Sequence, residues 1–189
     1  MRALILIVQT SLDGFVAGPN GEFDNFIGGE ENLEFVCSIT DDADAALLGR
    51  VSYQLLDSEW PTAASKPDAT KNEIKYSKWY NSVSKFVLSK SLKNKNAANT
   101  YIISENPESE INSIKQQPGK NILIFGSPTA VHSLFELNLI DSLWIIVHPV
   151  IFGKGIPFFR SFENIIKLDL VASKQLSNGT LCHKYLVSK

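Results

Sequence analysis

The stretch Asn121-Ile-Leu-Ile-Phe125-Gly126-Ser127-Pro128-Thr129-Ala130 decides the fold class of this chain. An apolar run with no polar alternation predicts a strand that is covered on both faces, as in a parallel sheet. Gly126 ends the strand, Ser127 is a preferred N-cap, and Pro128 suits the first position of a helix. Apolar residues from 131 to 135 follow at helical spacing. The stretch therefore predicts a buried strand that turns directly into a helix.

The start of this predicted helix is a candidate anion site. The first N–H groups of a helix lack intrahelical partners and carry a partial positive charge, so they attract phosphate or carboxylate. An ordinary strand–turn–helix unit without a ligand has the same local sequence, and such units are common. Both interpretations stay open on this segment alone.

The composition is that of one globular domain. The chain has 189 residues, of which 44% are hydrophobic and 20% charged, and its formal net charge is -2. These values are ordinary for a single domain with a substantial core. The small net charge gives no electrostatic footprint for nucleic acid or an anionic membrane. We expect one domain over residues 1–189, with neither kind of partner.

The short N-terminal apolar run and the isolated cysteines predict a cytoplasmic protein. The apolar run at residues 4–8 is too short for a signal-peptide core or a membrane span. Cys37 and Cys182 are isolated, which is typical of a reducing compartment. No cysteine or histidine pair has a metal-binding interval, so we expect no metal site. The three histidines, expected to be packing or surface residues, are His132, His148 and His183.

Strand-like and helix-like segments alternate along the first two thirds of the chain. Predicted helices cover residues 32–39 and 108–116, and predicted strands cover residues 4–8, 45–48, 86–88, 101–103 and 122–125. This alternation predicts an α/β fold with a parallel sheet. The polar segment 59–78 contains two prolines and is predicted to be a surface excursion with a short helix.

The last third favours antiparallel strands. Residues 143–150 form another apolar run, and a long connection leads from it to residues 168–172. Asn178-Gly179 is the preferred pair for a type I′ hairpin turn, and residues 180–187 suit the returning strand. We therefore expect an antiparallel C-terminal edge on a parallel centre.

Candidate ligand-binding residues follow three of the predicted strands, because ligands of open α/β sheets collect at the carboxyl ends of parallel strands. Two ends carry a cation beside a hydroxyl, and the third is the predicted helix start. A guanidinium can hold a 2′-phosphate bidentately, which favours NADPH over NADH. A solvated charge is the ordinary alternative for either cation alone. The three ends are Gly49-Arg50-Val51-Ser52, Ser89-Lys90-Ser91 and Gly126-Ser127.

Five motifs occur in an order that resembles the dihydrofolate reductase-like superfamily. They are Ser11-Leu-Asp-Gly-Phe-Val-Ala17, Leu48-Gly-Arg-Val-Ser-Tyr53, Phe86-Val-Leu-Ser-Lys90, Ile124-Phe-Gly-Ser-Pro-Thr-Ala130, and Ile140-Asp-Ser-Leu through His148-Pro-Val-Ile-Phe-Gly-Lys-Gly155. The chain is most similar to the C-terminal reductase domain of the bifunctional riboflavin-biosynthesis deaminase-reductase and to its stand-alone bacterial relatives. The resemblance covers nearly the whole chain. We expect no deaminase domain, because no zinc-ligand signature is present.

The resemblance implies a three-layer fold with a mostly parallel central sheet of about eight strands. It also implies that NADPH lies across the strand ends. Val16 and Ala17 would lie in the first loop against the nicotinamide. The adenosine-side phosphates would contact Gly49, Arg50, Val51 and Ser52. The adenine and its 2′-phosphate would contact Leu88, Ser89 and Lys90. The pyrophosphate would contact Gly126, Ser127, Pro128, Thr129 and Ala130.

The chain departs from the family pattern at two places. The family usually has a second glycine, often after a cis peptide bond, where this chain has Ser127. A cis bond before a non-proline residue costs about 2.5–4 kcal/mol, and the Cβ of Ser127 would crowd a phosphate, although its hydroxyl could donate to one. Relatives usually have a Trp where this chain has Asn25. Asn25 and the adjacent Phe26 are therefore the candidate substrate-contacting residues.

Few residues are candidates for catalysis. The cofactor carries the hydride, so the protein mainly orients the reactants and excludes water. Asp13 and Asp24 are the candidate proton donors, with water as an alternative, and each also suits a turn residue that bonds backbone. Gly153-Lys154-Gly155 is predicted to be a chain reversal near the cleft. Lys154 and Arg160 would reach a phosphorylated substrate if this late loop folds over the site.

We expect an NADPH-dependent reductase. The resemblance favours the 5-amino-6-(5-phosphoribosylamino)uracil of riboflavin biosynthesis as the heterocyclic substrate, whose ribosyl imine is reduced to a ribityl amine. The alternatives are reduction of dihydrofolate or another pteridine, and a noncatalytic nucleotide- or flavin-binding dimer. We also expect a homodimer, with residues 143–150 and 156–159 as its apolar surface.

Overall fold

The computed structural model describes residues 1–92, 98–159 and 162–188. Its main sheet has eight strands in the order β5-β4-β3-β6-β1-β7-β10-β9. Six strands run parallel: β1 (Leu4–Thr10), β3 (Ala43–Gly49), β4 (Ser84–Leu88), β5 (Thr100–Ile103), β6 (Asn121–Phe125) and β7 (Ser142–Val147). β10 (Leu181–Val187) is antiparallel to β7, and β9 (Leu168–Gln175) is antiparallel to β10. The predicted mostly parallel sheet with an antiparallel C-terminal edge is confirmed.

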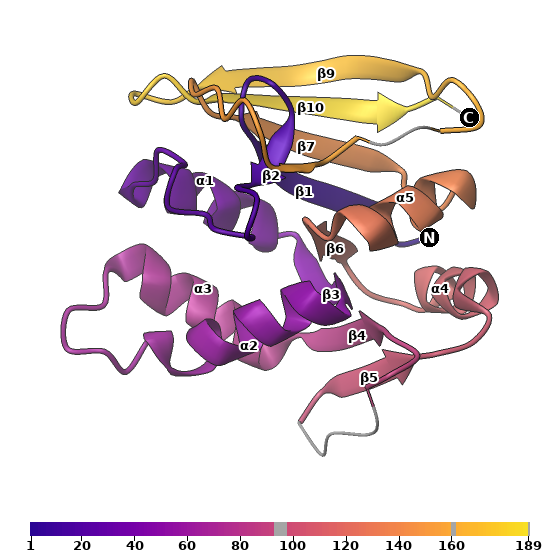
Figure 1. Ribbon diagram of the computed structural model, residues 1–189. Coiled ribbons are helices and arrows are strands. Elements are labelled where there is room, and N and C mark those ends of the chain that lie inside the picture. The colour runs from indigo at the N-terminus through magenta and orange to yellow at the C-terminus, as the bar shows by residue number, and fades with distance from the viewer. Residues whose placement is uncertain (93–97, 160–161, 189) are drawn as a thin grey trace.

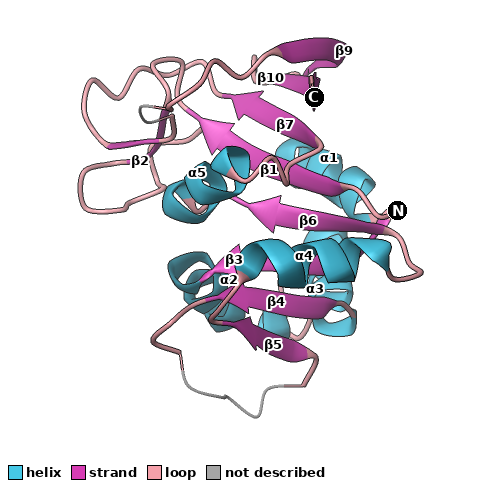
Figure 2. Ribbon diagram, turned by 90° about the vertical axis from the view of Figure 1, so that its right-hand side faces the viewer, coloured by secondary structure: helices cyan, strands magenta, loops and turns pink. Residues whose placement is uncertain are grey.

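Helices cover both faces of the sheet and complete three layers (Figures 1 and 2). One face carries α4 (Pro107–Gln116) and α5 (Pro128–Glu136). The other carries α1 (Glu30–Thr40), α2 (Arg50–Ala63) and α3 (Lys71–Ser82). The helices predicted at residues 32–39 and 108–116 correspond to α1 and α4. No helix in the described ranges is long and apolar enough to cross a membrane.

The central strand β1 is apolar without alternation because both of its faces are buried. Leu4 and Leu6 pack in the cluster that contains the inner faces of α4 and α5. Ile5 and Ile7 pack on the opposite side, in the cluster that contains Phe35 of α1. Full burial of such a side chain contributes about 1.5–3 kcal/mol. The apolar run at residues 4–8 thus packs against the helices on both faces of the sheet.

A second, two-stranded sheet lies beyond the carboxyl end of β1. β2 (Phe15–Ala17) pairs antiparallel with β8 (Ile156–Pro157). The pairing needs glycine at position 155, because a Cβ there would lie 2.3 Å from the carbonyl oxygen of Ala17. Val16 and Ala17, expected in a loop, are therefore buried in a short strand, fixed by a segment about 140 residues later in the chain.

The segment 59–78, expected as a surface excursion with one short helix, contains the end of α2 and most of α3, so that expectation is wrong. α3 begins at a capping box: Thr70 Oγ1 accepts from the N–H of Glu73, and Glu73 Oε2 accepts from the N–H of Thr70. Pro61 lies near the end of α2. Its carbonyl oxygen and that of Trp60 accept from side chains of α3, which supports the helix end despite the proline.

The C-terminal hairpin is confirmed, but its predicted type I′ turn is wrong. A type I′ turn needs positive φ at both central residues, whereas only Gly179 has it, at 86°. The N–H of Gly179 donates to the carbonyl of Leu176 at 3.0 Å, which gives a turn followed by a left-handed glycine. Asn178 Nδ2 donates to Asn32 Oδ1 of α1 at 2.6 Å. This contact with α1 holds the longer loop.

The strand predicted at 143–150 ends at Val147, and it does not form a free surface. β7 lies between β1 and β10, and Leu143 and Ile146 are buried in the core. Phe158 is also a core residue, whereas Phe159 is exposed. The antiparallel hairpin β9–β10 covers the outer edge of β7, and a dimer surface at residues 143–150 stays a prediction.

Candidate cofactor and substrate site

Three candidate groups lie at one edge of the sheet. β4, β3 and β6 are neighbours and run parallel, so their carboxyl ends share an edge. In Figure 2 the arrows of these strands point to the left, toward the side where β2 and its loops lie. Ser89-Lys90, Gly49-Arg50 and Gly126-Ser127 follow these strands in that order across the edge. The sheet thus brings together residues that are up to about 80 positions apart in the chain.

The starts of two helices lie in contact at this edge. Gly49 is the N-cap of α2, and Ser127 is the N-cap of α5. A Cβ on Gly49 would lie 2.0 Å from Ser127 Oγ, so only glycine allows this approach. Each helix start has unpaired N–H groups and a partial positive charge. Two such starts side by side form a stronger anion site than either one alone.

The Gly126–Ser127 turn has a left-handed backbone. Gly126 has φ 49° and Ser127 has φ 56°, and the described residues contain no cis peptide bond. A serine in this region costs about 1–2 kcal/mol relative to a right-handed conformation. Ser127 takes the predicted N-cap position, yet its side chain makes no capping hydrogen bond. Its hydroxyl points toward Gly49 instead, while a Cβ on Gly126 would meet open space.

The two candidate cations are exposed. Arg50 is the first residue of α2, and its Nη1 donates to Gln54 Oε1 at 3.1 Å along the same helix. Lys90 lies just after β4. The turn that contains it is held by Ser89 Oγ, which accepts from the N–H groups of Ser91 and Leu92 at 3.2 and 2.9 Å. Both charges are therefore available to an external anion at the end of adjacent strands.

Asp13 joins two loops. Its carboxylate accepts from Ser11 Oγ at 2.6 Å and from the N–H groups of Phe152 and Gly153 at 3.1 and 2.8 Å. The Ser11 hydroxyl, more than the two N–H groups, lowers the pKa of Asp13 below its ordinary value, against a smaller opposing effect of burial. Asp13 thus fastens the connection after β1 to the connection after β7. A catalytic role for this side chain stays a prediction.

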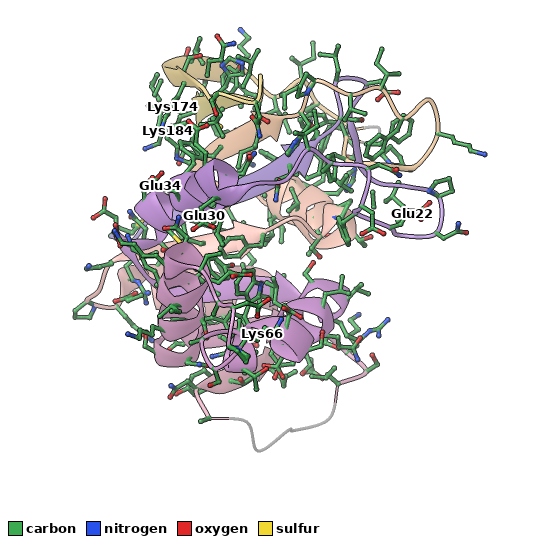
Figure 3. All side chains as sticks on the ribbon, turned by 90° about the vertical axis from the view of Figure 1, so that its left-hand side faces the viewer. Glu22, Glu30, Glu34, Lys66, Lys174 and Lys184 are labelled. Carbon is green, nitrogen blue, oxygen red and sulfur yellow. The ribbon has the colours of Figure 1, made fainter. Side chains whose placement is uncertain are left out.

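The loop at residues 18–29 carries the other candidate substrate residues. Asp24 and Asn25 are exposed. Phe26 packs on His148 and on Phe152, with ring centroids 4.7 and 5.0 Å apart. Glu22 marks this loop at the right of Figure 3. Phe26 therefore packs its loop against the segment after β7. These ring contacts limit the part of the Phe26 ring that a substrate could contact.

The late loop places Lys154 in solvent. Gly153 has φ 70°, and Lys154 is exposed just before the Gly155 contact with β2. The predicted chain reversal at this position is what connects β7 to β8. Arg160, the second basic residue expected here, lies outside the described residues.

The sequence analysis did not predict a contact between two polar residues, Gln9 and His148, at this edge of the sheet. His148 is fully buried, which agrees with the expected packing residue. Its Nε2 lies 2.9 Å from Oε1 of Gln9, near the end of β1. Gln9 is the one exposed residue of β1, whose other residues are buried. A polar residue that interrupts an apolar strand near its carboxyl end is the signal that could have identified Gln9.

The fold is that of the dihydrofolate reductase-like superfamily. The structure resembles dihydrofolate reductase from Enterococcus faecalis complexed with NADP(H) and RAB-propyl, with a TM-score of 0.65 and 16% identity over 99% of this chain and 97% of that one. It also resembles a putative riboflavin biosynthesis protein from Shewanella sp. PV-4, with a TM-score of 0.76 and 19% identity over 100% of both chains.

Within this fold, the chain belongs to the family of the RibD C-terminal domain, whose family model matches residues 2–182. The uncharacterized protein YyaP of Bacillus subtilis (strain 168) is 30% identical over 180 residues, which are 95% of this chain and 92% of YyaP. The resemblance to the riboflavin-biosynthesis reductase domain is thereby confirmed at the level of the family.

Proposed function

We propose that this protein is an NADPH-dependent reductase of a heterocyclic small molecule, with 5-amino-6-(5-phosphoribosylamino)uracil as its substrate. The observation that carries the proposal is the contact between Gly49 and Ser127, which places two helix starts together between the ends of neighbouring strands. Membership in the RibD C-terminal domain family supports the reductase class.

The residues at this edge fit a phosphorylated dinucleotide. The N–H groups at the starts of α2 and α5 suit the pyrophosphate, and Gly126 leaves open space where a side chain would obstruct it. Arg50 and Lys90, at the ends of adjacent strands, suit the 2′-phosphate because each supplies charge-assisted hydrogen bonds. Leu88, Val51 and Ser52 would flank the adenosine half. Ser127 keeps its hydroxyl against Gly49, so its backbone rather than its side chain would face the phosphate.

The remaining residues orient the reactants. When bound, NADPH supplies the hydride for the reduction. β2 and β8 form a wall beside the end of β1, and the buried residues Val16 and Ala17 of β2 would limit the access of water to the nicotinamide. Asp13 holds the two loops that border this wall. Asp24 and Asn25, exposed in the loop at residues 18–29, and Lys154, exposed in the loop after β7, are the proposed contacts to the substrate.

The cofactor proposal is tested with Arg50→Ala. Loss of a charge-assisted contact to the 2′-phosphate should weaken NADPH binding by about tenfold or more. NADH binding should change by less than about twofold, because NADH lacks this phosphate. Lys78→Ala, which removes an exposed lysine of α3, is the matched control and should change neither affinity. Equal losses for NADPH and NADH would show that Arg50 does not read the 2′-phosphate.

The substrate is tested by the loss of NADPH absorbance. Oxidation in the presence of the aminouracil, but not of dihydrofolate, supports the proposal. The reverse result assigns the protein to pteridine reduction.

A noncatalytic nucleotide- or flavin-binding protein is the second candidate. The strained conformation of Ser127 and the commitment of Asp13 to loop contacts favour it. Tight NADPH binding without oxidation by either substrate would establish this alternative.

We further propose a homodimer. With β7 covered, the exposed apolar residues of the edge strand β9, namely Leu168, Leu170 and Val171, replace residues 143–150 as the proposed surface. Light scattering should give twice the mass of one chain, and Val171→Lys should reduce it to one. A monomeric wild-type protein would end this proposal.

A further inference from the structure

Gln9 lies where the central strand extends beyond its neighbour. The last paired residues of β1 and β6 are Ile7 and Phe125, and the N–H of Gly126 then donates to the carbonyl of Ile7 at 3.0 Å. Gln9 follows two residues later, beside the turn assigned above to the pyrophosphate. Its side chain is on the α1 face of the sheet, together with Ile5 and Ile7, because side chains alternate along a strand. Gln9 thus presents a carboxamide at the same edge of the sheet as the proposed cofactor site.

His148 holds this carboxamide from the buried side. The register of β1 and β7 pairs Gln9 with Ile146 and Thr10 with Val147, and the N–H of His148 donates to the carbonyl of Thr10 at 2.8 Å. The imidazole is fully buried and packs against the ring of Phe26. Its Nε2 lies 2.9 Å from Gln9 Oε1, so the imidazole fixes this oxygen while the Gln9 side chain stays exposed.

A carboxamide held in this way offers one donor and one acceptor in a plane. A lactam edge, in which a ring N–H adjoins a ring C=O, is the complement of such a pair. A 2-amino-4-oxopteridine carries the same lactam edge, and its second edge, made of the ring N–H and the 2-amino group, presents two donors that a carboxylate complements.

We propose that Gln9 recognises the lactam edge of the substrate ring and that His148 is the positioning residue that orients Gln9. The proposal rests on the proposed function, because it deepens the assignment of the substrate. It assigns the recognition of the uracil-type ring of the proposed substrate to contacts with a ring N–H and the adjoining C=O. Gln9 touches the substrate, whereas His148 acts only through Gln9.

The probes are uracil and 1,3-dimethyluracil, which differ in both ring N–H groups, so that only uracil has a lactam edge. Their dissociation constants are measured by NMR titration, with and without saturating NADPH. The wild-type protein should bind uracil about tenfold more tightly than 1,3-dimethyluracil, as expected when one paired hydrogen bond is lost. Gln9→Ala should reduce this ratio to within about twofold while NADPH affinity stays unchanged.

The positioning role is tested by His148→Phe, which keeps a buried ring beside Phe26 and removes both ring nitrogens. It should lower the uracil ratio in the wild-type background but leave it unchanged in the Gln9→Ala background. A structural defect alone would weaken both probes equally and leave their ratio intact. His183→Phe makes the same change in β10, where His183 Nδ1 contacts Ser173 Oγ, and should leave the ratio at its wild-type value.

The outcomes separate the two proposals. If the ratio is the same in wild type and Gln9→Ala, or if neither probe binds, the role of Gln9 is overturned even when NADPH binds. If NADPH does not bind but Gln9→Ala abolishes the discrimination, the cofactor assignment fails and the ring-recognition role stands. If His148→Phe changes the ratio of the two dissociation constants equally in the wild-type and Gln9→Ala proteins, His148 does not act through Gln9.

Discussion

Gly49 and Ser127 meet across the ends of two neighbouring strands, so closely that a methyl group on Gly49 would lie 2.0 Å from Ser127 Oγ. The residues are distant in sequence, and the pairing of β3 with β6 brings them together. Because each is the N-cap of a helix, the contact fixes the spacing between the starts of α2 and α5.

Gly49→Ala should therefore destabilise the protein by about 1–3 kcal/mol through overpacking. Ser127→Gly removes the obstructing side chain and the left-handed strain, so the double variant should recover most of the loss. Urea denaturation measures each free energy of unfolding. Additive effects of the two substitutions would show that the two side-chain positions are not coupled.

Asp13→Asn should lower the free energy of unfolding at neutral pH and change how it depends on pH in acid. The pKa of Asp13 is lowered in the fold, chiefly by the Ser11 hydroxyl, so its ionised form is stabilised by folding. That contribution is present above the unfolded value near 3.8 and is lost as pH falls through the lower folded value. Wild type and variant should therefore converge in acid, as followed by urea denaturation between about pH 2 and 7.

The matched control for this prediction is Asp24→Asn, a change in the nearby exposed loop. It should alter the free energy of unfolding by less than about 0.5 kcal/mol, as is usual for surface substitutions. A gap between wild type and Asp13→Asn that persists unchanged at the lowest pH would contradict the role given to the Asp13 carboxylate.

His148 should make stability fall in mild acid. Burial lowers the pKa of His148 below its ordinary value of 6.5, against an opposing effect of the Ile27 backbone. Between the lowered folded value and 6.5, the unfolded chain binds a proton that the folded chain does not. Stability therefore falls as pH drops through this window, and the contribution of His148 stays constant below the folded pKa, where both states bind the proton. His148→Phe should reduce the slope of stability against pH. An unchanged slope in melting experiments from about pH 5 to 7 would exclude a contribution of His148.

Lys115→Met should destabilise the fold without touching the proposed site. The buried Lys115 Nζ donates to the carbonyl of Leu139 at 2.9 Å and to Asp141 Oδ2 at 2.6 Å, and the same carboxylate oxygen accepts from the N–H of Leu4. Removing one partner of a buried ion pair costs about 3–5 kcal/mol. This cluster lies at the amino end of β1, so NADPH affinity, measured below the melting temperature, should stay at its wild-type value. A reduced affinity would show coupling between the two edges.

Which residues follow the strand ends was predictable, because it depends on local pattern and on one general rule. Residues 122–125 are apolar without alternation, which indicates burial on both faces, and ligands of parallel sheets gather at carboxyl ends. The pattern and the rule together identify Gly49, Arg50, Lys90 and Ser127 from the amino-acid sequence alone. α2 was missed because Val51 and Leu55 are apolar yet exposed, and Pro61 lies inside the helix, so the segment has no clean helical pattern.

The sequence by itself determined which segments form the eight strands of the main sheet, that most of this sheet is parallel, and which residues follow the strand ends, because period and chain order express those properties directly. Only the tertiary structure decided that Ser127 closes on Gly49, that Asp13 ties two loops together, and that His148 holds Gln9 across 139 residues of chain. These contacts depend on the register between strands and on the packing of loops over them. Register is set by the whole sheet at once, so no local stretch of sequence contains it.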